Sequence, residues 1–152
     1  MLRKRTIIAL LVAMTAAAQE PDRTTAAIRS VISELNQARK DSDAKAVSEL
    51  FTRDGSLAVG NQILASGQTE IENLLQDPVI WSEVTAPSIQ IESLRFVFPD
   101  VALVDATQVQ FGSLLLKKSA PITLLLKLDW DTWRIVSLWI QPAMTYPFPV
   151  RF

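Results

Sequence analysis

Apolar residues recur at helical spacing near the start of the chain. They stand at Ile28, Val31, Ile32, Leu35 and Ala38. This i, i+3, i+4, i+7 spacing places the side chains on one face and predicts an amphipathic helix over residues 25–40. Thr24 or Thr25 stands at the position of an N-cap, where a side-chain oxygen accepts a hydrogen bond from the first turn.

Two shorter helices and one short strand are predicted next. The polar run 41–43 interrupts the apolar pattern and offers N-cap oxygens to a helix over residues 44–51. A short apolar segment over residues 56–59 predicts a strand that ends in a Gly-Asn turn. A third helix is expected to begin after Gly67 and to end before Pro78, because the residue before a proline disfavours the helical conformation.

From Pro87 onward apolar residues alternate and β-branched residues become frequent. A period of two is typical of strands, whose side chains alternate between the two faces of a sheet. Four consecutive antiparallel strands are predicted, over residues 88–98, 101–111, 122–130 and 133–141. Helices at one end of the chain and strands at the other predict an α+β domain with the helices on one face of a bent sheet.

Two of the predicted strands are apolar on both faces, over residues 122–128 and 135–140. Strands of this kind are normally covered on both sides. The sheet face away from the helices is therefore expected to be covered by the C-terminal segment, a ligand or another subunit.

Four segments of the chain stand in a recognisable order, namely residues 42–55, 67–71, 100–104 and 133–136. Their order and spacing resemble the NTF2-like superfamily, which includes SnoaL-like polyketide cyclases and ketosteroid isomerases. The resemblance implies a cone-shaped α+β fold, in which about three helices pack on a strongly curved, mainly antiparallel sheet around an apolar cavity. It also implies homodimers that form through the sheet face. It implies no reaction, because this fold hosts enzymes, ligand-binding proteins and association domains.

The catalytic residues of ketosteroid isomerases have no equivalents here. The resemblance places their carboxylate base at Val59 and their oxyanion-stabilising tyrosine at Leu35. A valine cannot accept a proton, and a leucine cannot donate a hydrogen bond to an oxyanion. No acidic residue occurs over residues 112–127, where a second oxyanion-stabilising acid would be sought. Isomerase chemistry of that kind is therefore not expected.

The N-terminus has the three parts of a secretory signal peptide. Residues 3–5 are basic, residues 7–14 are apolar and uncharged, and small residues follow. The apolar stretch is too short for a transmembrane helix, which needs about 20 residues. The sequence predicts a cleaved peptide over residues 1–18 and a single soluble domain over residues 19–152, located in the periplasm or secreted.

Removal of this peptide makes the chain acidic. The whole chain has 15 Lys and Arg against 16 Asp and Glu, and without Arg3, Lys4 and Arg5 the balance is 12 against 16, a net charge of −4. This balance argues against nucleic acid and against a membrane surface as partners, because both attract clustered Lys and Arg. The absence of histidine and cysteine argues against a zinc site, and no other metal or cofactor is predicted, because no phosphate-binding glycine motif or calcium-binding loop occurs.

Two charged residues interrupt apolar strands and are candidates for a ligand-binding site. Arg95 and Asp105 stand on either side of a turn at Pro99 and Asp100. A three-residue loop would set them directly opposite each other, and a two-residue loop would put them on opposite faces of the sheet. Asp105 is the remaining acid/base candidate for catalysis. A solvent-facing ion pair is the alternative interpretation.

Trp81 and Trp139 complete the candidate ligand-binding set. Trp81 follows the third helix, where members of the family often place the lip of the cavity, and Trp139 shares the alternation of Trp133 and Ile135. Aromatic side chains at such places bind flat apolar ligands, although core packing is their more common use. The apolar tail over residues 146–152 is expected to pack over the sheet or across a dimer.

Three functions are compatible with these features. The first is an exported, non-catalytic NTF2-like domain that binds a small apolar ligand or acts as an association module. The second is a SnoaL-like cyclase, isomerase or dehydratase that uses Asp105. The third is a dimeric structural or partner-binding domain whose cavity is filled by its own side chains. A filled cone would contradict the first two, and an Asp105 that points to solvent would contradict the second.

Overall fold

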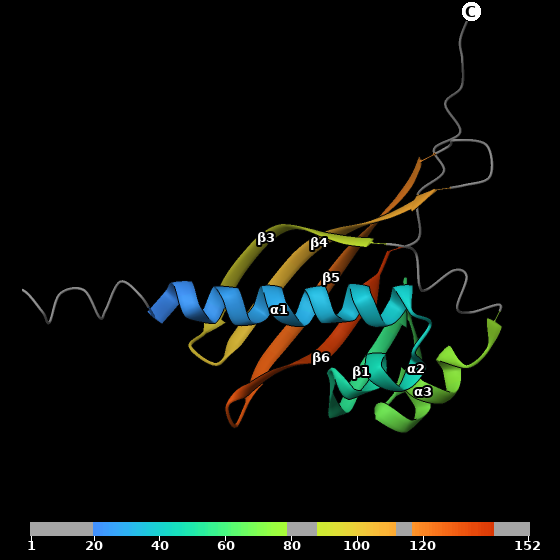
Figure 1. Cartoon of the computed structure of the whole chain (residues 1–152), viewed down its shortest axis with the longest axis horizontal. Coiled ribbons are helices and arrows are strands. Elements are labelled where there is room, and N and C mark those ends of the chain that lie inside the picture. Colours follow the sequence, from blue (N-terminus) through green and yellow to red (C-terminus); the bar gives the residue numbers. More distant parts are fainter. Residues whose placement is uncertain (1–19, 79–87, 112–116, 142–152) are drawn as a thin grey trace, which may run out of the picture.

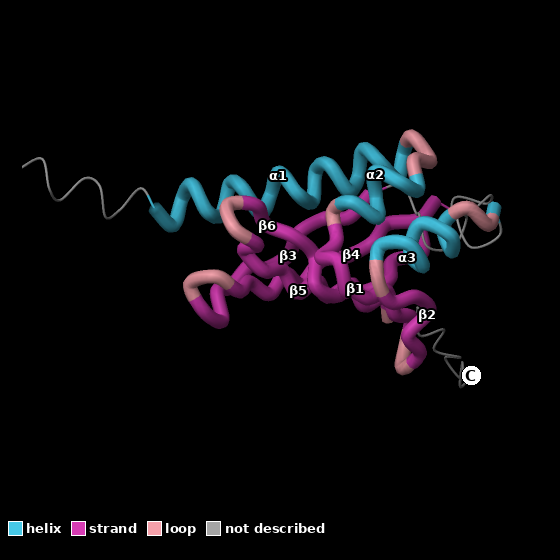
Figure 2. Tube along the Cα trace, turned by 90° about the horizontal axis from the view of Figure 1, so that it is seen from below, coloured by secondary structure: helices cyan, strands magenta, loops and turns pink. Residues whose placement is uncertain are grey.

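Three helices lie on one face of a six-stranded sheet, and no helix covers the other face in the part of the chain that the structure describes (Figure 1, Figure 2). The structure, a computed structural model, describes residues 20–78, 88–111 and 117–141. The helices are α1 (Glu20–Lys40), α2 (Ala44–Glu49) and α3 (Gln68–Leu75). α1 runs along the sheet, whereas α2 and α3 contact each other at one end of it (Figure 1).

The sheet is mixed and mostly antiparallel. Its strands are β1 (Phe51–Val59), β2 (Gln62–Ser66), β3 (Ser88–Phe98), β4 (Val101–Phe111), β5 (Lys117–Asp129) and β6 (Thr132–Ile140). They follow the order β2-β1-β6-β5-β4-β3, with β1 parallel to β6 and every other neighbouring pair antiparallel. The α+β architecture predicted from the sequence is confirmed.

The strand predictions are most accurate at residues 88–98 and 101–111, which are the observed bounds of β3 and β4. β5 begins earlier than predicted, at Lys117. β2 was not predicted at all, because four of its five side chains are exposed and no apolar alternation marks it. Its place in the sheet depends on pairing with β1 across the turn at Gly60 and Asn61.

The helix predictions differ from the structure at the start of α1 and at the end of α2. α1 begins at Glu20, so Thr24 and Thr25 lie inside the helix and the expectation that one of them caps it is wrong. α2 ends at Glu49 rather than at residue 51, because Phe51 pairs with Ile135 of β6 and belongs to the sheet. Tertiary pairing overrides the local helical pattern at this point.

Three sequence predictions fall outside the described residues. They concern the signal peptide over residues 1–18, Trp81, and the apolar tail over residues 146–152. None of the described helices is long and apolar enough to cross a membrane.

Asp43 is the N-cap of α2 and belongs to the polar run 41–43 that was predicted to supply this cap. Its Oδ1 accepts a hydrogen bond from the Ala46 N–H at 2.9 Å. We expect Asp43→Ala to lower the free energy of unfolding by about 1 kcal/mol in urea denaturation, because a first-turn N–H loses its acceptor. The exposed Asp54 provides a control, since Asp54→Ala should change stability by less than about 0.5 kcal/mol. Equal losses for the two variants would contradict the capping role.

The core lies between the helices and the inner face of the sheet. Its large fully buried apolar side chains are Ile28 and Leu35 of α1, Phe51 of β1, Ile71 of α3, Val104 of β4, Ile122, Leu124 and Leu126 of β5, and Ile135 of β6. The apolar stripe predicted for α1 is therefore confirmed. The Asn36 side chain fixes α1 on β3, because its Nδ2 donates to the Ile89 carbonyl at 3.0 Å and its Oδ1 accepts from the Ile89 N–H at 2.8 Å.

Candidate functional site

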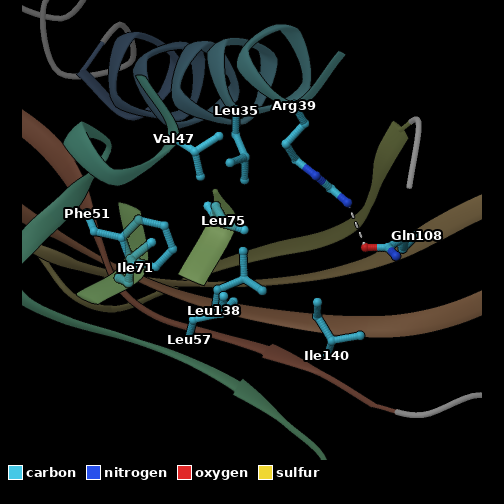
Figure 3. Close-up of a pocket in the computed structure, with 10 residues that line it drawn as sticks. All are labelled: Leu35, Arg39, Val47, Phe51, Leu57, Ile71, Leu75, Gln108, Leu138 and Ile140. Atoms are coloured by element: carbon cyan, nitrogen blue, oxygen red, sulfur yellow. Dashed lines mark hydrogen bonds between the residues drawn. The ribbon is translucent and has the colours of Figure 1, made fainter. Parts of the chain in front are cut away.

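The space inside the cone is nearly filled by side chains from all three helices and three strands (Figure 3). Those around it are Leu35, Arg39, Val47, Phe51, Leu57, Ile71, Leu75, Gln108, Leu138 and Ile140. The volume that the centre of a water molecule can occupy among them is about 20 Å³. That is room for about one water molecule, whereas ligand pockets measure roughly 300–1,000 Å³. The interior that these residues enclose has no room for a small apolar ligand.

Arg39 and Gln108 are the polar residues of this lining. Arg39 Nη2 donates a hydrogen bond to Gln108 Oε1 at 2.9 Å, and the two side chains point toward each other from α1 and β4 (Figure 3). Both are buried, and Arg39 is only 5% exposed. Burial lowers the pKa of the Arg39 guanidinium to about 10, because apolar surroundings disfavour the charged form. The group remains charged at neutral pH, in the last turn of α1, where the helix dipole favours a cation.

The outer face, which we define as the sheet face that no described helix covers, carries two rows of side chains that cross all six strands. The first row consists of Ile63, Ala58, Trp139, Thr123, Asp105 and Ser93. The second row consists of Ser66, Ser56, Ser137, Leu125, Leu103 and Arg95. Three of the four candidate ligand-binding residues, Arg95, Asp105 and Trp139, therefore share the outer face and do not line the interior.

Asp105 is held by hydroxyl groups from both neighbouring strands. Its Oδ2 accepts a hydrogen bond from Ser93 Oγ at 3.1 Å, and its Oδ1 lies 3.4 Å from the donor Thr123 Oγ1. Both partners stand directly opposite Asp105 in the sheet. The side chain is half-buried on the outer face, so it cannot exchange a proton with a molecule inside the cone.

Arg95 stands opposite Leu103, not opposite Asp105. The β3–β4 connection has two residues, Pro99 and Asp100, because Phe98 pairs with Val101. For a two-residue loop, the sequence predicted that Arg95 and Asp105 would lie on opposite faces of the sheet. That prediction is wrong, because both lie on the outer face. Val97 is an extra residue in β3, and this bulge returns Arg95 to the face of Asp105.

Trp139 lies on the opposite face from Trp133. The two residues share an odd-numbered alternation in the sequence, but Val136 is an extra residue in β6 and shifts the register against β5. Trp133 and Ile135 therefore point into the core, whereas Trp139 is 44% exposed on the outer face. The predicted common alternation is broken by this bulge.

A second, open depression of about 560 Å³ lies between α1, α2 and the start of β6. Glu34, Glu49 and Arg134 are its charged residues. The Arg134 Nη1 donates to the Glu49 carbonyl at 2.6 Å and is turned toward the end of α2. None of the sequence-predicted site residues that the structure describes lines this depression.

No protein-family model and no curated protein matches the chain. Solved structures do match. A protein from Novosphingobium aromaticivorans, described as NTF2-like with a cystatin-like fold, is 17% identical over 95% of each chain with a TM-score of 0.66. An NTF-2-like protein of unknown function from Shewanella oneidensis is 15% identical over 78% of this chain and 99% of its own, with a TM-score of 0.65. This chain has the NTF2-like fold.

A ketosteroid isomerase-like protein from Erwinia carotovora atroseptica has the same fold, with 18% identity over 76% of this chain and 93% of its own and a TM-score of 0.55. In this chain, Leu35 is fully buried in the interior lining and Val59 is half-buried on β1. Neither side chain can bind or release a proton at the positions where the resemblance places the isomerase residues.

Arg39 and Gln108 are polar residues of the interior that the sequence did not predict as site residues. One signal was available, because Arg39 follows Leu35 by four residues and so continues the apolar stripe of α1. Their pairing across 69 positions leaves no local pattern. Among the described residues, no group of three or more potential metal ligands occurs.

Proposed function

We propose that this chain is an exported, non-catalytic association domain that pairs with a second copy of itself through the outer face of the sheet. The observation that carries the proposal is the contrast between the two sides of the sheet. On the inner side, the space enclosed by the ten lining residues leaves only about 20 Å³ for the centre of a water molecule, whereas the outer face exposes large apolar side chains. Support for export comes from the signal-like pattern of residues 1–18.

The outer face has the composition of a protein interface. Trp139 and Ile63, in the first row, are 44% and 65% exposed. Leu103 and Leu125, in the second row, are half-buried between them and the β3 edge. An exposed tryptophan that shares a face with aliphatic side chains is typical of an interface, where a few side chains supply most of the binding energy.

Five of the seven polar side chains in the two rows already bond to one another. Ser56 Oγ and Ser137 Oγ share a hydrogen bond of 2.9 Å, and Asp105 accepts from Ser93 and Thr123. Buried polar groups cost free energy when they lose water without gaining a partner. Because these groups have partners within the sheet, a second protein surface can cover them at a smaller desolvation cost.

The charges of this face favour a second copy as the partner. Arg95 and Asp105 lie in neighbouring rows and on neighbouring strands. A two-fold axis that runs across the strands between the rows exchanges the rows. Across the interface between the two copies, Arg95 of one copy then lies in the same row as Asp105 of the other, one strand, about 5 Å, to its side. A symmetric interface forms this opposite-charge contact twice.

Sedimentation velocity of the purified protein tests the proposal. We expect the wild type to sediment at twice the mass of the processed chain, and Trp139→Asp to raise the dimer dissociation constant at least about thirtyfold, because it buries a charge at the centre of the interface.

Trp130→Asp is the matched control, because Trp130 is an exposed tryptophan outside both rows. This variant should remain dimeric. A wild type that is monomeric over the whole concentration range, or a folded Trp139→Asp variant that dimerises as tightly as the wild type, would overturn the proposal.

A further inference from the structure

Trp130 forms the tip of the β5–β6 hairpin and is almost completely exposed. Asp129 pairs with Thr132, so Trp130 and Asp131 are the two central residues of the turn. The Trp130 side chain is 95% exposed, more than any other large hydrophobic side chain in the described part of the chain. An indole in this position contributes no packing to the fold.

The backbone at Trp130 also disfavours a tryptophan. Its φ is +59°, and Ser42 is the other non-glycine residue with positive φ in the described ranges. A two-residue hairpin with positive φ at its first central residue alone follows the type II′ pattern, which prefers glycine there. A bulky side chain at positive φ is strained. Because the residue is unfavourable for both packing and backbone, its presence points to a role outside the fold.

Three aspartates belong to the same end of the sheet as the exposed indole. Asp129 and Asp131 flank Trp130 in the chain. Asp100 belongs to the β3–β4 turn. This turn is hydrogen-bonded to β5, because the Leu128 N–H donates to the Asp100 carbonyl at 2.8 Å. Figure 1 shows both turns at the same end of the sheet. The hairpin tip, defined here as Trp130 with these three aspartates, therefore combines one aromatic surface with concentrated negative charge.

Two basic residues lie two pairs further along the same hairpin from the Asp129–Thr132 pair. Lys127 and Arg134 stand opposite each other. Arg134 Nε is 3.9 Å from Asp129 Oδ2, and its Nη1 is bonded to the Glu49 carbonyl, which turns the guanidinium toward α2. Asp100 and Asp131 form no ion pair with any described residue, so the tip keeps an excess of negative charge.

We infer that the hairpin tip is a docking site for a basic segment of a partner protein, with an arginine or lysine side chain of that segment over the Trp130 ring. A cation over the face of an indole is attracted by the ring's electron density. The aspartates add charge-assisted hydrogen bonds to the same cation and its neighbours. The same carboxylates repel an anionic lipid surface. A neutral sugar could stack on the indole but would form no ion pair with the aspartates.

Isothermal titration calorimetry with a hexa-arginine peptide, acetylated at its N-terminus and amidated at its C-terminus, tests this inference. We expect the wild type to bind with an affinity that falls as salt is added. Trp130→Gly should weaken binding at least about tenfold. The same substitution should leave the midpoint of thermal unfolding unchanged or raise it, because glycine accepts the positive φ without strain.

Further variants separate this site from the association face. Asp131→Asn should weaken peptide binding, and Trp139→Asp should bind hexa-arginine as the wild type does even if it no longer self-associates. The inference is overturned if Trp130→Gly binds hexa-arginine unchanged, or if it unfolds at a clearly lower temperature, which would give Trp130 a structural role. Binding through Trp130 to maltohexaose or to phosphatidylglycerol vesicles, with no binding of the peptide, would overturn it as well.

Discussion

Replacing Phe51 by alanine is expected to lower the free energy of unfolding by about 3–5 kcal/mol, because the substitution removes a large buried ring and leaves a cavity. Phe51 is 1% exposed and lines the small interior space. The chain packs closely against it, since a Cβ added at Gly55 would lie 3.0 Å from Phe51 Cβ. Such close packing leaves little freedom for the surroundings to collapse into the space. Urea denaturation measures the loss.

The same variant tests whether lack of space is the only property that keeps a small apolar ligand out of the interior. Its enlarged cavity would be lined mainly by leucine, isoleucine and valine side chains, and apolar cavities of this kind stay dry and bind benzene. We expect benzene to raise the midpoint of thermal unfolding of Phe51→Ala and to have no such effect on the wild type.

Phe98 supplies the matched control, because it is 62% exposed at the end of β3. Phe98→Ala should change the free energy of unfolding by less than about 0.5 kcal/mol. A loss below about 1 kcal/mol for Phe51→Ala would mean that the interior is loosely packed, and it would remove the main argument for a filled cone.

Replacing Gln108 by leucine is expected to cost about 2–3 kcal/mol, because hydrogen bonds to charged groups contribute this much when they are buried. The substitution deprives the Arg39 guanidinium of the Oε1 acceptor at 2.9 Å. Combining it with Arg39→Met should recover part of the loss, since an apolar pair of similar size avoids burying a charge. The coupling energy from the four-member cycle, measured by urea denaturation, reports the interaction directly.

The effect of Arg39 should not depend on pH between about 5 and 9. The pKa of Arg39 in the folded state is about 10, and burial has lowered it, so the unfolded value is higher still. Both states therefore hold the proton throughout this range. Because the folded pKa is the lower of the two, the burial cost would decrease only as the pH rises above 10.

Gln90 provides the control for this cycle, because it is exposed on β3 and lies outside the core. Gln90→Leu should leave stability within about 0.5 kcal/mol of the wild type. If Gln108→Leu lowers the free energy of unfolding no more than Gln90→Leu does, the Arg39–Gln108 hydrogen bond does not stabilise the fold.

The order and type of most elements followed from the sequence because their signals are local. The apolar stripe of α1 and the alternation of β3 and β4 each occur within a few turns or a few residue pairs. Asp43 was predicted as a cap because a cap needs only an acceptor within three residues of its donor. Local signals failed where pairing partners decide the structure, as at Phe51 and in β2.

The candidate site was predicted less well than the fold, because a site depends on which face each side chain occupies. One extra residue in a strand moves all following side chains to the other face. The alternation cannot reveal such a bulge in a strand that is apolar on both faces, as β6 is. Val136 therefore left no signal in β6, and Val97 left none in β3 because its neighbours Phe96 and Phe98 are also apolar. The faces of Arg95 and Trp139 were decided only by the register of the sheet.

The sequence by itself determined most of the helices and strands, the turn at Gly60 and Asn61 and the NTF2-like resemblance, because these depend on spacing along the chain. The tertiary structure alone decided that the interior is filled, that Arg39 meets Gln108, and that Arg95, Asp105 and Trp139 share the outer face. These outcomes depend on volumes and registers between segments far apart in the chain. Composition and periodicity carry no information about such distances.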